Sequence, residues 1–256
     1  MPEDAPPRPA PESDQLRIAG MVPLSTVDWP GHLAASLFLQ GCPLACPYCH
    51  NWEILDMRSP GQVAFSQLRQ LLSQRRGLLD GVVFSGGEPL AQPAATSAMR
   101  EVHELGFAVG LHTSGAFPQR LTVFLAQTDW VGYDIKALPE GYALAAGNKH
   151  AGERAWEGLE ILIAVAAKRA GSERPLDYEV RHTTFPGAPK EEALAVARRL
   201  HELGVQSFAL QQANLKTARP GGLDQVSAQQ WNERVRETNE QIAALGFEQY
   251  NFRPAH

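Results

Sequence analysis

All three cysteines of the 256-residue chain lie between positions 42 and 49, as Cys42, Cys46 and Cys49. An odd number of cysteines spaced this closely cannot form a disulfide framework, and it indicates a metal or catalytic site in a reducing compartment such as the cytoplasm. The segment also contains Gly41 and two prolines, and it directly follows a short apolar run. We therefore expect a loop after a strand, in which three thiolates can converge on one metal centre.

The number of thiolates bears on which metal they hold. Three do not complete the usual four-cysteine set of a [4Fe–4S] cluster, and the sequence contains no fourth cysteine. One iron would then lack a cysteine ligand, and an open metal position is typical of catalytic sites. The alternative is zinc with three cysteines and either His50 or a distant histidine. Because His50 directly follows Cys49, shared tetrahedral coordination is awkward, and no second ligand pair has zinc-finger spacing. The spacing favours the cluster.

The composition argues against several classes of protein. No apolar run approaches the roughly 20 residues that span a bilayer, so we expect no membrane-spanning helix and no membrane partner. A formal net charge of −5 argues against a protein that coats nucleic acid. Five of the 19 prolines fall within the first 11 residues. We expect residues 1–14 to form a disordered, Pro-rich leader and residues 15–256 to form the folded domain.

From about residue 33 onward, short β-branched apolar runs alternate with helical patterns. The runs show little apolar–polar alternation, which suits parallel strands covered on both faces. Six strand–helix units imply right-handed crossovers, and they are too few to close the eight-stranded barrel of about 250 residues. We therefore predict an α/β fold, a partial (β/α)6 TIM-like barrel, with a flat doubly wound sheet as the competing topology. The predicted strands are Ala34–Leu39, Gly81–Ser85, Ala108–Thr113, Trp130–Ile135, Tyr178–Thr184 and Ser207–Gln212.

In either topology, ligands bind at the carboxyl ends of the strands, and the predicted strand ends carry polar motifs. The second predicted strand leads into Gly86, Gly87 and Glu88. Two glycines allow a ligand to approach the backbone closely, although most such pairs are only tight turns. The third strand ends at Thr113 and Ser114, whose hydroxyls could receive a ribose or cap the following helix.

Charged residues mark the next two strand ends. Asp134 and Lys136 are two residues apart on a strand, so they point to the same face and could together reach a zwitterionic ligand. A surface ion pair is the alternative for these two residues. Arg181 on the fifth strand could bind a carboxylate, or it could pair with a neighbouring acid. The sixth strand ends in Gln211 and Gln212, to which we assign no role.

The cysteine spacing with Tyr48 before the third cysteine, followed 37 residues after Cys49 by Gly-Gly-Glu-Pro at the next strand end, resembles the radical S-adenosylmethionine (SAM) superfamily. The resemblance implies that the three cysteines hold a [4Fe–4S] cluster whose open iron is chelated by the amino and carboxylate groups of SAM. It also implies that the stretch from Tyr48 to His50 lies along the adenine. By the same resemblance, Gly86, Gly87 and Glu88 would line the methionine amino group.

Further motifs resemble one subgroup of that superfamily. The strings CPYCHN and DIK resemble glycyl-radical-enzyme activases, in which the aspartate and lysine contact SAM. The segment GMVPLSTVDWPG at residues 20–31 resembles the opening of the anaerobic ribonucleoside-triphosphate reductase activating protein family. Together with YEVRHTTFPG and FALQQ, this resemblance extends over most of residues 16–252.

The resemblance implies a function and partners. One-electron reduction of the cluster, by a flavodoxin- or ferredoxin-type donor, would cleave SAM to methionine and a 5′-deoxyadenosyl radical. That radical would abstract a hydrogen atom from a backbone glycine of a glycyl radical enzyme, which we expect to be anaerobic ribonucleotide reductase. One alternative keeps this chemistry on a small molecule, as in 7-carboxy-7-deazaguanine synthase-like enzymes. A non-enzymatic zinc-binding interaction module is the other.

Overall fold

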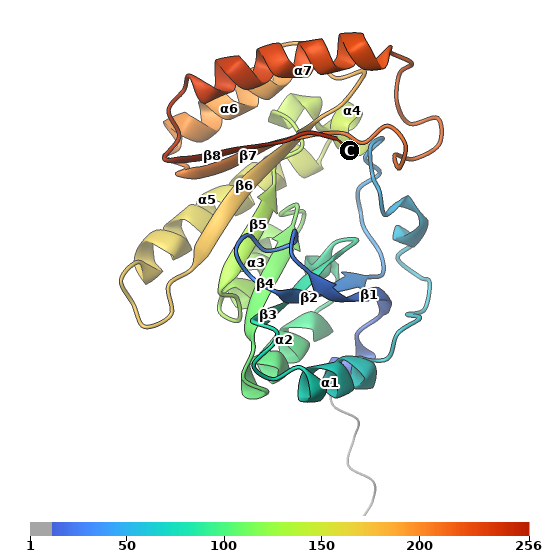
Figure 1. Ribbon diagram of the computed structural model, residues 1–256, viewed down its shortest axis with the longest axis vertical. Helices are drawn as coiled ribbons and strands as arrows, with labels where there is room; N and C mark the ends of the chain where they lie inside the picture. Colours follow the sequence, from blue (N-terminus) through green and yellow to red (C-terminus); the bar gives the residue numbers. More distant parts are fainter. Residues whose placement is uncertain (1–11, 256) are drawn as a thin grey trace, which may run out of the picture.

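A computed structural model describes residues 12–255 of the chain. Its sheet contains eight strands in sequential order, of which β1 pairs antiparallel with β2 and every later pair is parallel. The sheet curves, with β1 and β8 at its two ends and the helices outside it (Figure 1). The strands are β1 (Ile18–Ser25), β2 (Ala34–Leu39), β3 (Gly81–Gly86), β4 (Ala108–Thr113), β5 (Trp130–Asp134), β6 (Asp177–Thr184), β7 (Ser207–Gln212) and β8 (Gln249–Arg253).

The six predicted strands are confirmed as β2 to β7, each within one residue at either end. Their apolar runs are buried on both faces, as in β2, where five of six residues are buried. The predicted partial barrel is also confirmed. A doubly wound sheet reverses its strand order at a switch point, whereas this sheet proceeds in one direction from β1 to β8 without closing.

Two strands at the sheet edges were not predicted. In β1, residues Val22, Pro23 and Leu24 are exposed, and the pairing with β2 shifts register twice, so no regular burial pattern appears in the sequence. In β8, the run QYNFR is short and polar, with no fully buried residue. Both strands form because a neighbour offers free backbone hydrogen-bonding groups rather than because their own apolar pattern requires it.

The helices cover the outer face of the sheet. Apolar residues at three-to-four spacing along the helices are buried, such as Leu68 and Leu72. Gly106 and Gly204 adopt φ values of 88° and 76° directly after two helices, as expected for C-terminal caps. No helix among residues 12–255 is long and apolar enough to cross a membrane. The α-helices are α1 (Phe65–Gln74), α2 (Ala94–Glu104), α3 (Pro118–Leu125), α4 (Tyr142–Ala146), α5 (Ala151–Arg169), α6 (Glu192–Glu202) and α7 (Ala228–Ala243).

Short 3₁₀ helices complete the fold, and the first of them bears on the predicted leader. Residues 12–14, which we assigned to the leader, belong to η1 (Glu12–Gln15). There Ser13 is buried and donates to Glu101 at 2.6 Å, and Asp14 lies 2.6 Å from Arg69. The leader prediction for residues 1–11 lies outside the described residues. The other 3₁₀ helices are η2 (Trp52–Ile54), η3 (Pro89–Ala91) and η4 (Pro139–Gly141).

The amino-terminal end of the barrel is filled by aromatic side chains. Trp29 stacks on Trp130 with ring centroids 5.7 Å apart, and both residues are buried. A Cβ atom at Gly81 or Gly110 would approach the Trp29 ring to 3.0 Å or less, so glycine at both positions makes room for it. With this end plugged, the space for a ligand lies at the opposite end, where the strands finish.

Candidate cluster and cofactor site

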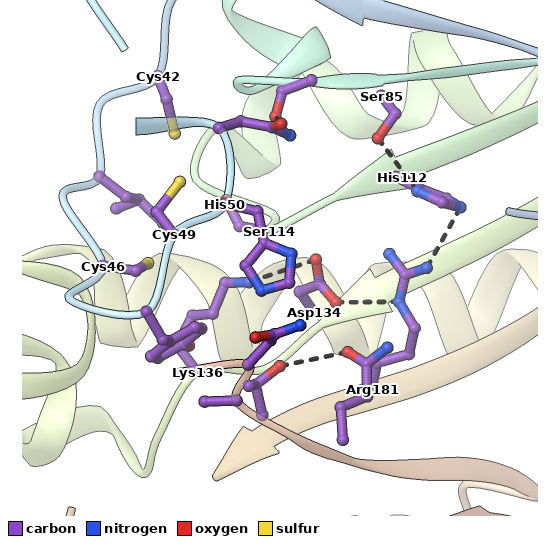
Figure 2. A pocket seen from close by; sticks show the side chains of 18 of the residues that line it. Cys42, Cys46, Cys49, His50, Ser85, His112, Ser114, Asp134, Lys136 and Arg181 are labelled. Carbon is purple, nitrogen blue, oxygen red and sulfur yellow. Dashed lines mark hydrogen bonds and ion pairs between the residues drawn. The ribbon is translucent and has the colours of Figure 1, made fainter. Parts of the chain in front are cut away.

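A cavity of about 420 Å³ lies at the carboxyl ends of the strands, beside the cysteine loop (Figure 2). Residues at the ends of β3 to β8 contribute to its wall, so the polar motifs of these strand ends lie around one cavity. Every predicted site residue except Glu88 lines it, namely Cys42, Cys46, Tyr48, Cys49, His50, Gly86, Gly87, Thr113, Ser114, Asp134, Lys136 and Arg181.

The cysteine loop is held in place by backbone hydrogen bonds at its start and in its middle. Gly41, with φ of 96°, begins the loop, and its N–H donates to Ile54 at 2.8 Å. The N–H of Ala45 donates to Ala146 at the end of α4, also fixing the middle of the loop. All three cysteines are free thiols. The loop is therefore ordered by contacts that do not involve its sulfur atoms.

The thiols need a metal to become thiolates. Burial raises the pKa of Cys46 to about 11, although the nearby Lys136 ammonium opposes this effect. Burial likewise raises the pKa of Cys42 and of Cys49. Bound metal ions deprotonate coordinating thiols outright, which overcomes such a shift. The three sulfurs therefore suit metal coordination better than nucleophilic catalysis, which requires a lowered thiol pKa.

The donor set fits a cluster. No three His, Cys, Asp or Glu side chains within residues 12–255 converge as the ligands of a single ion would. A [4Fe–4S] cluster takes each thiolate on a different iron, so its ligands need to face one cavity rather than meet at one point. Cys42, Cys46 and Cys49 meet this condition, because all three line the same cavity.

Gly86 and Gly87 connect the second motif to the cysteine loop. A Cβ at Gly86 would lie 2.1 Å from the Leu39 nitrogen, and one at Gly87 would lie 2.1 Å from the Gly41 carbonyl oxygen. The Gly87 N–H also donates to the Leu39 carbonyl at 2.9 Å. Only glycine allows the end of β3 to pack this closely against the start of the cysteine loop. The two motifs therefore form one continuous backbone unit.

Glu88 differs from the expectation that it lines the ligand space. Its side chain is 1% exposed, and its carboxylate accepts hydrogen bonds from Leu90 N–H, the Thr113 hydroxyl, and both the N–H and hydroxyl of Ser114. Burial raises its pKa, and these hydrogen bonds oppose that shift. Glu88 thus joins the ends of β3 and β4 from behind the cavity wall. The Thr113 and Ser114 hydroxyls, predicted for a ribose, donate to this carboxylate.

A chain of polar contacts runs along the wall of the cavity inside the barrel (Figure 2). Ser85 contacts His112 at 3.1 Å, and His112 lies 3.2 Å from the Arg181 guanidinium. Arg181 donates to Asp134 at 2.9 Å, and the Lys136 ammonium lies 3.3 Å from the same carboxylate. Burial and the nearby Arg181 charge lower the pKa of His112 to about 3, so this imidazole is neutral at physiological pH. The chain therefore ends in one carboxylate between two cations.

Arg181 has a different environment from the one expected for a carboxylate-binding group. Its guanidinium also donates to the Gly132 carbonyl at 3.1 Å, and its side chain is 9% exposed. The contacts with Asp134, Gly132 and His112 occupy it within the protein. Its clearest role is to hold Asp134, and the alternative we had kept open, an acidic partner, is the one that the geometry favours.

Asp134 and Lys136 remain suited to a zwitterionic ligand. Burial raises the pKa of Asp134, but the Arg181 and Lys136 charges outweigh this effect and lower it to about 2. Burial lowers the pKa of Lys136, whereas Asp134 raises it, and the net direction is upward. Both groups are therefore charged, and both line the cavity. They offer a carboxylate for an ammonium group and an ammonium for a carboxylate.

Apart from Arg181, sequence reasoning missed the wall formed by β6 to β8. Arg253 lines the cavity and pairs with the buried Glu179 at 2.8 Å, but no signal pointed to it because β8 was not predicted. Ser85 and His112 could have been found. Each lies two residues before a predicted site residue, Gly87 and Ser114, and alternate residues of a strand share a face. The additional lining residues on this side are Thr183, Gln211, Gln212, Ala213, Asn214, Arg253, Pro254 and Ala255.

Comparison with known proteins agrees with this site. The family model of the radical SAM superfamily matches residues 36–200, which is more than half of the chain. The chain therefore belongs to the radical SAM superfamily and is an enzyme of this type, whose cofactors are a [4Fe–4S] cluster and SAM. The alternative of a non-enzymatic zinc module is set aside.

Two similar proteins and one solved structure show which members of the superfamily this chain resembles. A Methanocaldococcus jannaschii protein assigned to the glycyl-radical enzyme activating enzymes is 28% identical over 208 residues, which cover 78% of this chain and 81% of that protein. The pyruvate formate-lyase-activating enzyme of Clostridium pasteurianum is 32% identical over 137 residues, covering 51% of this chain and 57% of the enzyme. A solved structure of TYW1 with a lysine-pyruvate adduct bound has a TM-score of 0.59 at 12% identity, covering 82% of this chain and 73% of that one. At this identity it shows the shared fold alone.

Proposed function

We propose that this enzyme generates a glycyl radical on a partner protein, and that the partner is anaerobic ribonucleoside-triphosphate reductase. The observation that supports the first part is the similarity to two activating enzymes of glycyl radical enzymes or pyruvate formate-lyase, one of them covered over 81% of its length. The second part is supported by the resemblance of residues 20–31 and the later segments to activators of that reductase.

Three cysteines and two charged residues would hold the cofactors. Cys42, Cys46 and Cys49 would bind the cluster, and Asp134 with Lys136 would bind the amino-acid part of SAM. Bound together, the cluster and SAM supply a hydrogen-abstracting radical by one-electron reduction. The buried Trp29–Trp130 stack fills the end of the barrel opposite the cavity, and the polar chain from Ser85 to Lys136 forms part of the cavity wall. The protein thereby supplies orientation and isolation, which is the usual contribution of a protein to cofactor chemistry.

The open edge of the sheet suits a peptide substrate. A glycyl radical forms on backbone, so a loop of the partner must enter the cavity. Strands β1 and β8 are the ends of the sheet and do not pair with each other. The cavity wall reaches this edge through Arg253, Pro254 and Ala255. A gap between edge strands can admit an extended chain that a closed barrel would exclude.

The test is an anaerobic activation assay. Reconstituted enzyme, SAM, reductant and the reductase from the same genome should give the doublet of a glycyl radical by electron paramagnetic resonance (EPR). A reductase with its radical-site glycine changed to alanine is the matched control and should give no doublet. If a well-folded reductase gives no doublet while SAM is cleaved, the partner proposal is wrong. If SAM is not cleaved at all, the cofactor site rather than the partner is at fault.

A small-molecule substrate, as in 7-carboxy-7-deazaguanine synthase-like enzymes, is the second candidate. The fold is compatible with it, because the solved TYW1 structure carries a small adduct. A peptide with the sequence of the reductase loop around the radical-site glycine, deuterated at that glycine, distinguishes a peptide substrate from a small-molecule substrate. Deuterium transfer from that glycine into 5′-deoxyadenosine supports the peptide substrate, and transfer only from an added small molecule supports the alternative. We further propose a flavodoxin- or ferredoxin-type electron donor and a cytoplasmic location.

A further inference from the structure

The two edge strands of the sheet, β1 and β8, differ in how well they resist pairing with another strand (Figure 1). In β1, Pro23 lacks a backbone donor, and two register shifts interrupt the pairing with β2. Proline and bulges are devices by which natural proteins protect an edge strand. β8 contains no proline, and all five of its residues pair with β7 in one unbroken register. The free edge of β8 is therefore the one suited to accept a further strand.

The backbone groups of β8 that point to this free edge follow from its pairing. The Gln249 N–H donates to the Gln206 carbonyl, directly before β7, at 2.9 Å. The N–H and C=O of one strand residue point to the same side, and successive residues point to opposite sides. By this alternation, the N–H and C=O of Tyr250 and Phe252 point away from β7. Among residues 12–255, no other helix or strand packs broadly against β8 to cover them.

The side chains of β8 give the two faces of this edge different chemistry. Gln249 and Asn251 line a second cavity, of about 740 Å³, at the amino-terminal ends of the strands. Neither side-chain amide has a hydrogen-bond partner among residues 12–255. On the other face, Tyr250 and Phe252 pack against the core. Because side chains of neighbouring strands contact each other on each face, a strand beside β8 would meet uncharged amides on one face and aromatic rings on the other.

Arg253 is the one charged residue of β8, and its charge is balanced within the protein. Its guanidinium pairs with both oxygens of the buried Glu179 on β6, at 2.8 and 2.9 Å. Arg253, Pro254 and Ala255 all line the cavity beside the cysteine loop. The edge of β8 therefore needs no charged partner, and its carboxyl end opens on the cavity that we assign to the radical chemistry.

We propose that residues flanking the radical-site glycine of the partner add as an extended strand to the free edge of β8, and that this pairing brings the glycine to the cavity. The inference rests on the proposed function, since it states how the peptide substrate of that function is held. Strand addition is an established mode of peptide recognition, and it recognises backbone, which is also where a glycyl radical forms. The paired segment is uncharged and alternates polar with apolar side chains, to match the two faces of β8.

The first test measures peptide binding without catalysis. Protein reconstituted with the cluster and SAM, but without reductant, is titrated against a fluorescein-labelled 11-residue peptide, and fluorescence anisotropy gives the Kd. The peptide has the sequence of the reductase loop around the radical-site glycine. N-methylation then removes one backbone donor at a time. Because alternate residues of an added strand face β8, methylation at every second position on one side of the glycine should weaken binding by about two- to tenfold. Effects without this alternation would contradict strand pairing.

Phe252→Pro and Phe252→Ala are a matched pair of enzyme variants. Both remove the ring, but only proline removes the N–H at the free edge, where proline is compatible with a strand. Phe252→Pro should bind the peptide about two- to tenfold more weakly than Phe252→Ala. Equal Tm values show that the two variants fold alike, and the methylation pattern of the parent protein depends on neither. Equal Kd values in the two variants, or no saturable binding to the parent, would overturn the inference.

The glycyl radical doublet on the whole reductase distinguishes a failure of this inference from a failure of the proposed function. If both Phe252 variants form the doublet at the same reductase concentration as the parent, strand addition is wrong and the proposed function stands. If the parent binds the peptide with the alternating pattern but forms no doublet, strand addition is supported and the proposed function is wrong. A homodimer that Phe252→Pro alone dissociates in sedimentation would assign the edge to a second copy of the chain and overturn the inference.

Discussion

Asp134 and Arg181 are register partners on neighbouring strands, and the Arg181 Nε donates to the Asp134 carboxylate at 2.9 Å inside the barrel. Lys136 contacts the second oxygen of the same carboxylate at 3.3 Å. The side chains of Asp134 and Arg181 are 23% and 9% exposed. An ion pair at this depth orients Asp134 toward the cavity and keeps it ionised, because its pKa is lowered to about 2 despite the opposing effect of burial.

Replacing Arg181 by alanine should destabilise the protein strongly. The change leaves Asp134 without its main partner, and breaking a buried pair from one side costs about 3 kcal/mol or more. Urea unfolding of the metal-free protein measures the effect. Lys190→Ala is the control, because Lys190 is 69% exposed and 3.9 Å from Glu237, and such surface pairs contribute roughly 0–1 kcal/mol. Equal effects of the two substitutions would contradict the role of Arg181 in holding Asp134.

Two glycines in strands should respond differently to alanine. A Cβ at Gly132 would lie 2.6 Å from the Arg181 guanidinium carbon, whereas a Cβ at Gly20 meets nothing within 4 Å. Gly132→Ala should therefore displace Arg181 and cost about 1–3 kcal/mol through overpacking. Gly20→Ala should be neutral or stabilising by roughly 0.4–1 kcal/mol, since it restricts only the unfolded chain. Thermal unfolding distinguishes the two variants, and the reverse order would show that the Gly132–Arg181 contact is misplaced.

Stability of the metal-free protein should fall as the pH drops from about 6.5 to 4. Burial lowers the pKa of His182 to about 4, and its Nδ1 lies 3.0 Å from the Ile135 carbonyl. In this window the unfolded chain binds a proton and the folded protein does not, so protonation favours unfolding. His182→Asn keeps a donor for that carbonyl and should reduce the slope by up to about 1.4 kcal/mol per pH unit. Urea midpoints across the pH range give the slope, which would be identical in both proteins if His182 were not responsible.

Cys46→Ala and Lys136→Ala should separate cluster binding from cofactor binding. Cys46→Ala leaves too few thiolates, so iron content and SAM cleavage should be lost while the circular dichroism spectrum is retained. Lys136→Ala should keep its iron and bind SAM about tenfold more weakly, as expected for one lost charged interaction. Iron analysis and equilibrium dialysis provide the two measurements. If Lys136→Ala loses iron as much as it loses SAM, Lys136 is needed for the cluster and our assignment is wrong.

The sequence predicted the parts of the fold that depend on local pattern. The continuous apolar runs of β2 to β7 leave little freedom in their assignment, and the cysteine spacing with Gly86 and Gly87 places the site at the strand ends. Asp134 and Lys136 were also predicted to share a face, because that follows from the period of a strand. The sheet confirms the strands, and Gly86, Gly87, Asp134 and Lys136 line one cavity with the cysteines.

What could not be predicted depends on contacts between distant parts of the chain. The carboxylate of Glu88 is occupied by Thr113 and Ser114, which lie 25 and 26 residues later. Arg181 is held by Asp134, 47 residues earlier. Neither pairing has a local signal, so Glu88 was assigned to the ligand, and for Arg181 a ligand carboxylate and an acidic side chain both stayed open. The edge strand β8, and Arg253 with it, escaped prediction because a short polar run becomes a strand only beside a neighbour with free backbone groups.

The most direct test of the site is the EPR spectrum of the reduced cluster before and after SAM is added. Three cysteine ligands leave one iron able to bind the cofactor, so SAM should change the spectrum of the parent protein, and Lys136→Ala should require more SAM for the same change. Iron and sulfide should each be present at about four per chain. A spectrum insensitive to saturating SAM, or protein carrying a single zinc ion and no sulfide, would contradict the account.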